Sequence, residues 1–307
     1  MWGDKRYHTL NYELRKIFGQ KVMKLSLDGG FTCPNRDGTI GDKGCIFCGE
    51  EGSGEFAGCR YLSIKEQIEE QKELLSKKWN TDKYIAYFQN FTNTYSSYDD
   101  LREKYYAAIS EEGVVSLAIA TRPDCLSDEV MDLLTEINEK TFLWVELGLQ
   151  TIHESSAKFI RRGYPLEIYN KAVEKLKERN IKVVTHLIFG LPDESKEDIL
   201  ESVKYVGNTN TWGVKFHLLY IQKETDLYRY YIKKPFPIFT REEYISLVVD
   251  GLELLPVEMV VHRLTGDGKK ELLYKPRWSL DKLRVLSGID REMKIRSSYQ
   301  GLKFQSI

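Results

Sequence analysis

Short apolar segments alternate with amphipathic helical segments until about residue 225 of this 307-residue chain. Six of the apolar segments have the composition of buried strands, and they cover residues 22–27, 84–89, 114–120, 142–149, 182–189 and 214–221. This alternation is typical of parallel βα units, in which helices cover the faces of the sheet. A closed α/β barrel needs eight such units. Six units therefore predict an open, partial (β/α)6 barrel of the TIM type.

The helices between these strands have recognisable beginnings. Ser63 precedes an apolar stripe and is followed three residues later by Glu66, which is the pattern of a capping box. Ser127 and Ser195 stand at the corresponding position before two later helices. The helices are therefore predicted to start at residues 64, 128 and 196.

The pattern changes after residue 225. Residues 233–237 contain two prolines and interrupt it, after which a helix is expected over residues 240–255 and a strand over residues 257–262. We therefore divide the chain into a barrel core of residues 1–225 and a C-terminal α/β extension of residues 226–307. The extension is expected to complete the sheet edge or to cover the barrel mouth.

Three of the five cysteines stand close together, in the pattern Cys-x11-Cys-x2-Cys formed by Cys33, Cys45 and Cys48. Three thiolates can hold an iron–sulfur cluster that keeps one iron open for a further ligand. Zinc is the alternative, because Cys59 would complete a set of four thiolates. Zinc ribbons, however, usually contain two closely spaced pairs, and Cys33 has no close partner. The spacing alone leaves both metals possible.

Polar side chains lie at or near the ends of all six predicted strands. They are Cys33, Gln89, Thr92, Asn93, Arg122, Glu146, Gln150, His186, Lys215, His217 and Tyr220. Ligands of parallel α/β folds bind at the carboxyl ends of the strands. Each residue alone has a structural explanation, since His186 or His217 could be a core histidine with satisfied hydrogen bonds. Together they predict one pocket.

The whole arrangement resembles the radical S-adenosylmethionine (SAM) superfamily. The usual motif has three residues between its first two cysteines, whereas this chain has eleven, as in the branch that contains the catalytic elongator subunit. Residues 146–151 and 161–163 resemble the segments by which coproporphyrinogen dehydrogenase-like members hold SAM. Residues 186–192 resemble the adenine-contacting fifth strand of the same group. The resemblance covers about residues 15–225 and favours the iron–sulfur cluster over zinc.

The resemblance implies two cofactors, a [4Fe–4S] cluster and SAM. Cys33, Cys45 and Cys48 would ligate three irons, and the fourth iron would bind the methionine part of SAM. The residues that it implies for SAM binding are Phe47, Gln89, Thr92, Glu146, Gln150, Arg162, His186, Ile188 and Leu191. Gln89 and Thr92 stand where many members have Gly-Gly-Glu, a triplet that this chain lacks. The implied chemistry is cleavage of SAM to a 5′-deoxyadenosyl radical, with flavodoxin or ferredoxin as the electron donor.

Three segments, residues 28–39, 87–94 and 121–125, resemble a bacterial branch of the superfamily almost as blocks. This branch includes queuine lyase, which frees the base queuine from queuosine 5′-phosphate for salvage, and it also has members of other function. The resemblance therefore implies a radical SAM lyase that acts on a nucleoside-type substrate by breaking the bond between base and sugar. A tRNA-modifying enzyme is the alternative.

Charge favours the small nucleotide over tRNA. The formal net charge is −1, whereas a protein that binds tRNA usually neutralises many phosphates with an excess of basic residues. Residues 256–307 hold eleven Lys and Arg against six Asp and Glu, which is enough for a local anion site. The residues expected to bind substrate are Asn93, Arg122, His217, Tyr220, Arg263, Lys270 and Trp278.

Composition also bears on the cellular compartment and on the class of protein. No apolar run approaches the ~20 residues that span a bilayer, and an odd number of cysteines in a large chain does not suggest a disulfide framework. We therefore expect a cytoplasmic protein with no membrane partner. A non-catalytic zinc-binding module that uses Cys33, Cys45, Cys48 and Cys59 is the alternative from another class.

Overall fold

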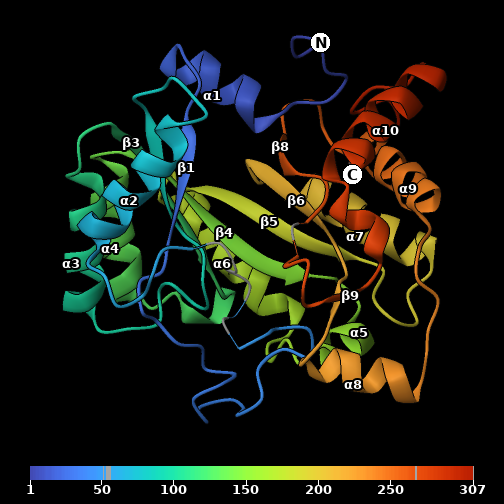
Figure 1. Cartoon of the computed structure of the whole chain (residues 1–307), viewed down its shortest axis with the longest axis horizontal. Helices are drawn as coiled ribbons and strands as arrows, with labels where there is room; N and C mark the ends of the chain where they lie inside the picture. The colour runs from blue at the N-terminus through green and yellow to red at the C-terminus, as the bar shows by residue number, and fades with distance from the viewer. Residues whose placement is uncertain (51, 53–56, 267, 307) are drawn as a thin grey trace.

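Seven parallel strands form one curled sheet in the computed structural model, which describes residues 1–50, 52, 57–266 and 268–306. In sheet order the strands are β1 (Met23–Leu27), β2 (Tyr84–Phe88), β3 (Val114–Thr121), β4 (Phe142–Gln150), β5 (Lys182–Phe189), β6 (Gly213–Leu218) and β8 (Val260–Arg263). Every neighbouring pair in this sheet is parallel. The predicted partial α/β barrel is therefore confirmed (Figure 1).

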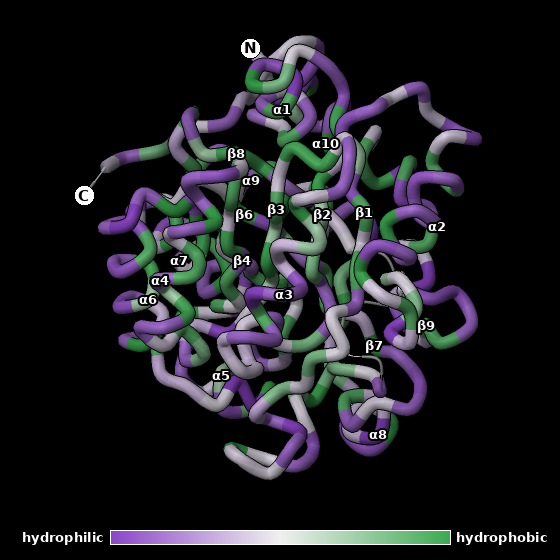
Figure 2. The backbone as a smooth tube through the Cα atoms, turned by 90° about the vertical axis from the view of Figure 1, so that its left-hand side faces the viewer, coloured by the Kyte–Doolittle hydropathy of each residue, from purple (hydrophilic) through white to green (hydrophobic). Residues whose placement is uncertain are grey.

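Helices cover the outer face of the sheet, and apolar strand residues fill the interior that they enclose (Figure 2). The helices that follow the first six sheet strands are α2 (Ile64–Ser76), α3 (Tyr98–Ile109), α4 (Asp128–Asn138), α6 (Leu166–Glu178), α7 (Lys196–Asn208) and α9 (Arg241–Glu253). The predicted helix starts are confirmed, since Ser63 forms a capping box with Glu66, and Ser127 and Ser195 accept capping hydrogen bonds. None of the described helices is long and apolar enough to cross a membrane.

The two faces of the strands bury different cores. Residues on the outer face, such as Leu147 and Phe216, are completely buried among the helices. On the inner face, Trp144 packs near the amino ends of the strands with Leu14 of α1 (Leu10–Phe18). Each large apolar side chain buried in this way contributes roughly 1.5–3 kcal/mol. Apolar packing thus fills the inner face of the barrel near the amino ends of the strands, and the pocket described below lies toward their carboxyl ends.

The chain departs from the predicted strand over residues 214–221 after Leu218. The neighbouring strand β5 ends at Phe189, so the chain beyond Leu218 has no long partner in the sheet. It passes through Leu219 and Tyr220 into β7 (Ile221–Gln222), which pairs antiparallel with β9 (Leu273–Lys275). Tyr220 therefore lies in a connection and not in a strand.

The segment after residue 225 contributes one strand to the sheet and several helices around it. The expected last strand is observed as β8, which pairs with β6 and adds a seventh parallel strand. The remaining elements are α5 (Glu154–Phe159), α8 (Asp226–Lys233), α10 (Lys282–Ile295) and the short 3-10 helices η1 (Pro123–Cys125) and η2 (Arg277–Leu280). The division of the chain at residue 225 stays a prediction, because β8 shares one sheet with the strands that precede that residue.

Candidate active site at the carboxyl ends of the strands

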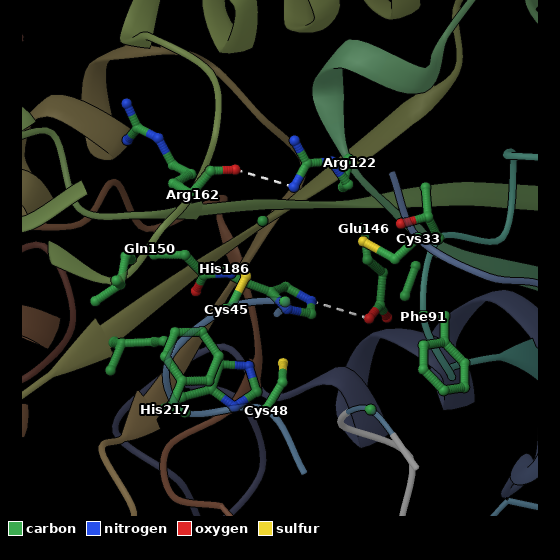
Figure 3. A pocket seen from close by; sticks show the side chains of 18 of the residues that line it. Cys33, Cys45, Cys48, Phe91, Arg122, Glu146, Gln150, Arg162, His186 and His217 are labelled. Atoms are coloured by element: carbon green, nitrogen blue, oxygen red, sulfur yellow. Dashed lines mark hydrogen bonds and ion pairs between the residues drawn. The ribbon is translucent and has the colours of Figure 1, made fainter. Parts of the chain in front are cut away.

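A cavity of about 240 Å³ lies at the carboxyl ends of the strands. Its lining comes from the loop after β1 and from strands or strand ends as far as β8, so residues distant in sequence meet there (Figure 3). The predicted residues that it brings together are Cys33, Cys45, Phe47, Cys48, Gln89, Thr92, Arg122, Glu146, Gln150, Arg162, His186, Ile188, His217, Tyr220 and Arg263. The single pocket expected from the strand ends is therefore present.

The three predicted cysteine ligands line this pocket together, and none of them is in a disulfide. A hydrogen bond with Cys48 lowers the pKa of Cys45 to about 7, and the same bond raises the pKa of Cys48. The cations of Arg122 and Arg36 also lower the pKa of Cys45. Because thiolates are the metal-binding form of cysteine, these cations favour the ligand state at this end of the pocket.

Backbone and side-chain hydrogen bonds hold the cysteine loop in place. Asn35 donates through Nδ2 to the carbonyl of Arg161 at 2.7 Å and to Sγ of Cys45 at 3.6 Å. Arg36 donates to the carbonyl of Cys48 at 3.4 Å, and the backbone of Ile46 is bonded to that of Ile160 at 3.2 Å. The loop that carries the thiols is therefore tied to the segment around α5 and not only to its own strand.

The positions of the cysteines argue against a mononuclear zinc site. Tetrahedral zinc with ligands at about 2.3 Å holds its sulfur atoms about 3.8 Å apart. Within the described part of the chain, the one group of three or more candidate ligand atoms that lie within 4.8 Å of one another is His153, Asp198 and Glu201, and it contains no cysteine. Cys59 is exposed and does not line the pocket. The residue that would complete a four-thiolate zinc site is therefore outside the pocket that the other three cysteines line.

Glu146 lies at the centre of a buried hydrogen-bond network on the pocket floor. Its Oε2 accepts from Tyr87 at 2.8 Å and from His186 at 3.0 Å, and it also contacts the ammonium group of Lys215. Its Oε1 accepts from Trp144 at 2.9 Å. The side chain has no exposed surface. Both carboxylate oxygens are thus already engaged by the protein.

Charge keeps this carboxylate ionised. Burial by itself raises the pKa of Glu146, but the cations of Lys215 and Lys24 outweigh that effect and hold the pKa well below its usual value. Lys24 approaches Oε1 to 4.0 Å and is partly exposed. Contact between Glu146 and a ribose hydroxyl stays a prediction, and the geometry shows that Glu146 orients His186 directly.

Two histidines stand side by side above this floor. The rings of His186 on β5 and His217 on β6 have centroids 4.9 Å apart. Burial lowers the pKa of His186 to about 4, with a further lowering by Lys215. Because Glu146 is ionised and accepts from Nε2 of His186, the proton of this neutral imidazole lies on Nε2. Its other ring nitrogen is then an acceptor.

Arg162 binds the protein's own backbone rather than pointing at the cysteines (Figure 3). Its guanidinium donates to the carbonyls of Tyr164 at 2.8 Å and Thr151 at 2.7 Å, and to the carboxylate of Glu154 at 2.8 Å. The residue is 2% exposed. Its predicted contact with the carboxylate of SAM stays a prediction, because these bonds already use the guanidinium to brace the loop after β4.

Two buried polar atoms test whether the pocket suits ligands. Oγ1 of Thr92 and Nε2 of His217 are both buried and have no hydrogen-bond partner in the described structure. Both residues line the cavity, together with the three cysteines and with the guanidinium groups of Arg36 and Arg122. An iron–sulfur cluster held by three thiolates is anionic, and SAM carries amino, carboxylate and hydroxyl groups. The cations and the two unpaired atoms therefore fit both groups.

Four predicted site residues do not line the pocket. Leu191 packs in an apolar cluster behind it, and Asn93 is completely buried with Nδ2 donating to the carbonyl of Ala120 at 2.7 Å. Lys270 is exposed, and the indole of Trp278 donates to the carbonyl of Phe239 at 3.0 Å. Their predicted roles therefore have no support from the pocket geometry.

Sequence reasoning did not single out three lining residues. Tyr87 shares the inner face of β2 with Gln89, and strand alternation could have identified it. Phe91 has a φ of 58°, which is uncommon outside glycine. The guanidinium of Arg36 lies 5.5 Å from its ring centroid, within the range of a cation–π contact. No sequence pattern predicts this contact between Arg36 and Phe91.

Comparison with protein families gives two matches. Residues 35–206 match the family described as Radical SAM superfamily, and residues 211–295 match the family described as Radical_SAM C-terminal domain. The first match covers more than half of the chain and includes Cys45, Cys48 and the strand ends from β2 to β5.

Comparison with individual proteins agrees with these matches. YtqA of Bacillus subtilis (strain 168) is 48% identical over 304 residues, which are 99% of this chain and 94% of YtqA. The tRNA uridine(34) acetyltransferase of Methanocaldococcus jannaschii is 26% identical over 161 residues, which are 52% of this chain and 29% of that protein. The structure of Methanocaldococcus infernus Elp3 with an N-terminal deletion superposes with a TM-score of 0.70 at 19% identity, over 91% of this chain and 64% of that one. At that identity the likeness shows a shared fold.

Proposed function

This chain belongs to the radical SAM superfamily, and on that premise we propose that it acts on a nucleoside-type substrate, releasing queuine from queuosine 5′-phosphate. It is an enzyme that binds a [4Fe–4S] cluster and SAM, as members of this superfamily do. When bound, these groups supply a 5′-deoxyadenosyl radical, which removes a hydrogen atom from the substrate. The residues of the chain have to hold the groups, orient the substrate and exclude water.

The pocket divides naturally into a cofactor side and a substrate side. We assign the cluster to Cys33, Cys45 and Cys48, and the methionine part of SAM to the neighbourhood of Thr92, whose buried hydroxyl has no partner in the described structure. Gln150 at the end of β4 and His186 on β5 lie farther along the sheet, and we assign their hydrogen-bonding groups to the nucleoside part of SAM. The substrate then occupies the side toward β6 and β8.

The observation that carries the substrate proposal is the place of Arg263. This residue ends β8, at the opposite edge of the sheet from β1, and lines the same pocket as the cysteine loop that follows β1. Its positive charge lowers the pKa of His186 and His217. A guanidinium group beside the pocket can bind the single phosphate of a nucleotide.

The chemistry of the substrate gives a reason for a radical enzyme. Hydrolysis of a purine nucleoside is normally assisted by protonation of the base at its N7 atom. In a 7-deazaguanine base this atom is carbon, so the usual acid catalysis is not available. A radical formed on the sugar offers another way to break the bond between base and sugar.

The test supplies the reduced, reconstituted enzyme with three substrates in parallel: queuosine, queuosine 5′-phosphate and queuosine-containing tRNA. Free queuine is measured by mass spectrometry, and formation of 5′-deoxyadenosine is measured in the same samples. The proposal predicts most product from queuosine 5′-phosphate. Product from none of the three, with SAM still cleaved, would refute the substrate while leaving the superfamily chemistry in place.

A tRNA-modifying enzyme is the second candidate. The similarity to a tRNA uridine(34) acetyltransferase over half of this chain favours it, whereas the net charge of −1 favours the small nucleotide. Turnover of the intact tRNA alone, with a steep loss of affinity as salt rises, would establish this alternative.

Turnover also requires an electron donor, for which we propose a flavodoxin or a ferredoxin. The five cysteines are all free thiols. A reducing cytoplasm keeps such thiols available as cluster ligands, so the cytoplasm is the proposed compartment.

A further inference from the structure

His217 is expected to bind substrate, and its surroundings point to a more specific role. It lies on β6 with its ring beside that of His186, at a centroid separation of 4.9 Å (Figure 3). Its Nε2 is buried and makes no hydrogen bond to any described residue. Leaving a buried polar atom unpaired costs roughly 1–3 kcal/mol. Such a cost is understandable where a ligand supplies the missing partner.

The surroundings of His217 favour a neutral imidazole. Burial lowers its pKa well below the usual value, and the positive charges of Arg263 and Lys215 lower it further. The carboxylate of Glu146 acts in the opposite direction and is outweighed. A neutral imidazole can accept a proton from a ligand, whereas a charged one cannot.

We propose that His217 is a catalytic residue that accepts a hydroxyl proton from the ribose of the substrate as the base departs, and then transfers that proton to the base. The role rests on the proposed function, since it requires a nucleoside whose base is released. It differs from substrate binding, because a binding residue would affect hydrogen abstraction and base release equally.

The proposed step is balanced in atoms and electrons. A radical can expel the base only from the carbon next to the one that bears the base, and in a ribonucleoside this carbon carries the 2′-hydroxyl. The O–H bond breaks and its proton moves to His217 while a carbonyl forms at the 2′ carbon. The bond between sugar and base breaks with its electron pair on the base, and the unpaired electron moves to the carbon that held the base. The imidazolium then protonates the base, and the sugar radical that remains takes one electron from the proposed flavodoxin or ferredoxin and one proton from water, so that atoms, charge and electrons balance.

The test compares His217→Gln and His217→Asn with wild-type enzyme and with His262→Gln as the matched control. His262 is also a histidine whose two ring nitrogens are buried and unpaired in the described structure, but it lies between Trp144 and Trp212 and does not line the pocket. Iron content and SAM binding are measured first. Queuine and 5′-deoxyadenosine are then counted in each reaction with queuosine 5′-phosphate and with its 2′-O-methyl analogue.

The role predicts that the His217 variants retain iron, bind SAM and form 5′-deoxyadenosine, while queuine release falls at least about 100-fold, in the range of general acid–base catalysis. The ratio of 5′-deoxyadenosine to queuine should rise by the same factor. His262→Gln should leave the ratio unchanged, and the 2′-O-methyl analogue should yield no queuine with any enzyme.

Three results would overturn the role. Equal losses of both products would make His217 a binding residue, and unchanged queuine release would make it dispensable. Loss of iron from both His217 variants would make it a structural residue. Absence of queuine from the wild-type reaction is a distinct outcome, which refutes the proposed function and the role together.

Discussion

Replacing Glu146 by leucine should destabilise the protein strongly, because burial already lowers the pKa of Lys215 well below its usual value and the substitution removes the carboxylate that favours its charged form. Glu146 accepts hydrogen bonds from Tyr87, His186 and Trp144 in addition to its ion pair with Lys215, and its side chain is fully buried. Removing one partner of a buried ion pair costs about 3–5 kcal/mol, since the remaining charge keeps its desolvation penalty. We expect Glu146→Leu to lower the free energy of unfolding by that amount.

The double variant Glu146→Leu, Lys215→Met separates this explanation from a simple loss of packing. It removes both charges, so the buried cation no longer exists, and the double variant should be more stable than Glu146→Leu alone. Unfolding in urea at pH 7 would be followed by far-ultraviolet circular dichroism, because the hydrogen bond of Trp144 makes its fluorescence an unsuitable probe. A double-mutant coupling of about 2 kcal/mol or more is expected.

The reasoning would be refuted by either of two results. If Glu146→Leu unfolds at nearly the wild-type urea concentration, the carboxylate has no buried charge partner. Strict additivity of the two substitutions would show that Glu146 and Lys215 do not interact, although Lys215 is 4% exposed and in contact with the carboxylate.

Three further predictions concern the cluster, acidity and the loop after β4. Cys45→Ala should lose nearly all iron after reconstitution, whereas Cys59→Ala should retain it because Cys59 is exposed and outside the pocket; equal losses by iron assay would contradict the three-ligand assignment. Stability should fall as the pH is lowered from 6.5 to 4, because burial holds the pKa of His186 at about 4 and the unfolded chain takes up a proton that the folded chain does not. His186→Gln should reduce the dependence of the free energy of unfolding on pH over that range, by at most about 1.4 kcal/mol per pH unit. The free energy is measured by urea unfolding at each pH, and an unchanged pH dependence would argue against a neutral buried imidazole. Arg162→Ala should lower the free energy of unfolding by about 2–4 kcal/mol, since its guanidinium binds backbone carbonyls and Glu154; unchanged stability with weakened SAM binding would instead assign the guanidinium to SAM.

The sequence was sufficient to predict where the pocket forms. Parallel strands bring their carboxyl ends to one edge, so polar residues there, such as Gln89 and His217, must lie near one another once the alternation of strands and helices is recognised. Cys45 and Cys48 are likewise close together in any fold, because only two residues separate them in the sequence. These predictions depend on hydrophobic periodicity, which is local, and on the parallel topology that alternating strands and helices favour.

What the sequence did not reveal is how each polar side chain uses its hydrogen bonds. The carboxylate of Glu146 meets Tyr87 from β2 and Lys215 from β6, and only the curl of the sheet brings these strands close across the barrel. Arg162 donates to the backbone carbonyls of Thr151 and Tyr164, and no pattern in the sequence predicts these bonds.

The place of the basic and aromatic residues near the C-terminus also could not be predicted from the sequence. Trp278 and Lys270 are close in sequence to Arg263, yet the indole of Trp278 packs against Tyr244 and Lys270 faces solvent. Residue type suggested substrate binding there, but the segment is too irregular to have a strand or helix period from which the direction of a side chain could be predicted.

Anaerobic reconstitution followed by incubation with SAM and a reductant tests the central claim most directly. The account predicts a brown protein with about four irons per chain that converts SAM to methionine and 5′-deoxyadenosine, and that loses both the iron and the conversion when Cys33, Cys45 or Cys48 is replaced by alanine. A colourless protein that retains zinc, or a fully loaded cluster that forms no 5′-deoxyadenosine after reduction, would contradict it.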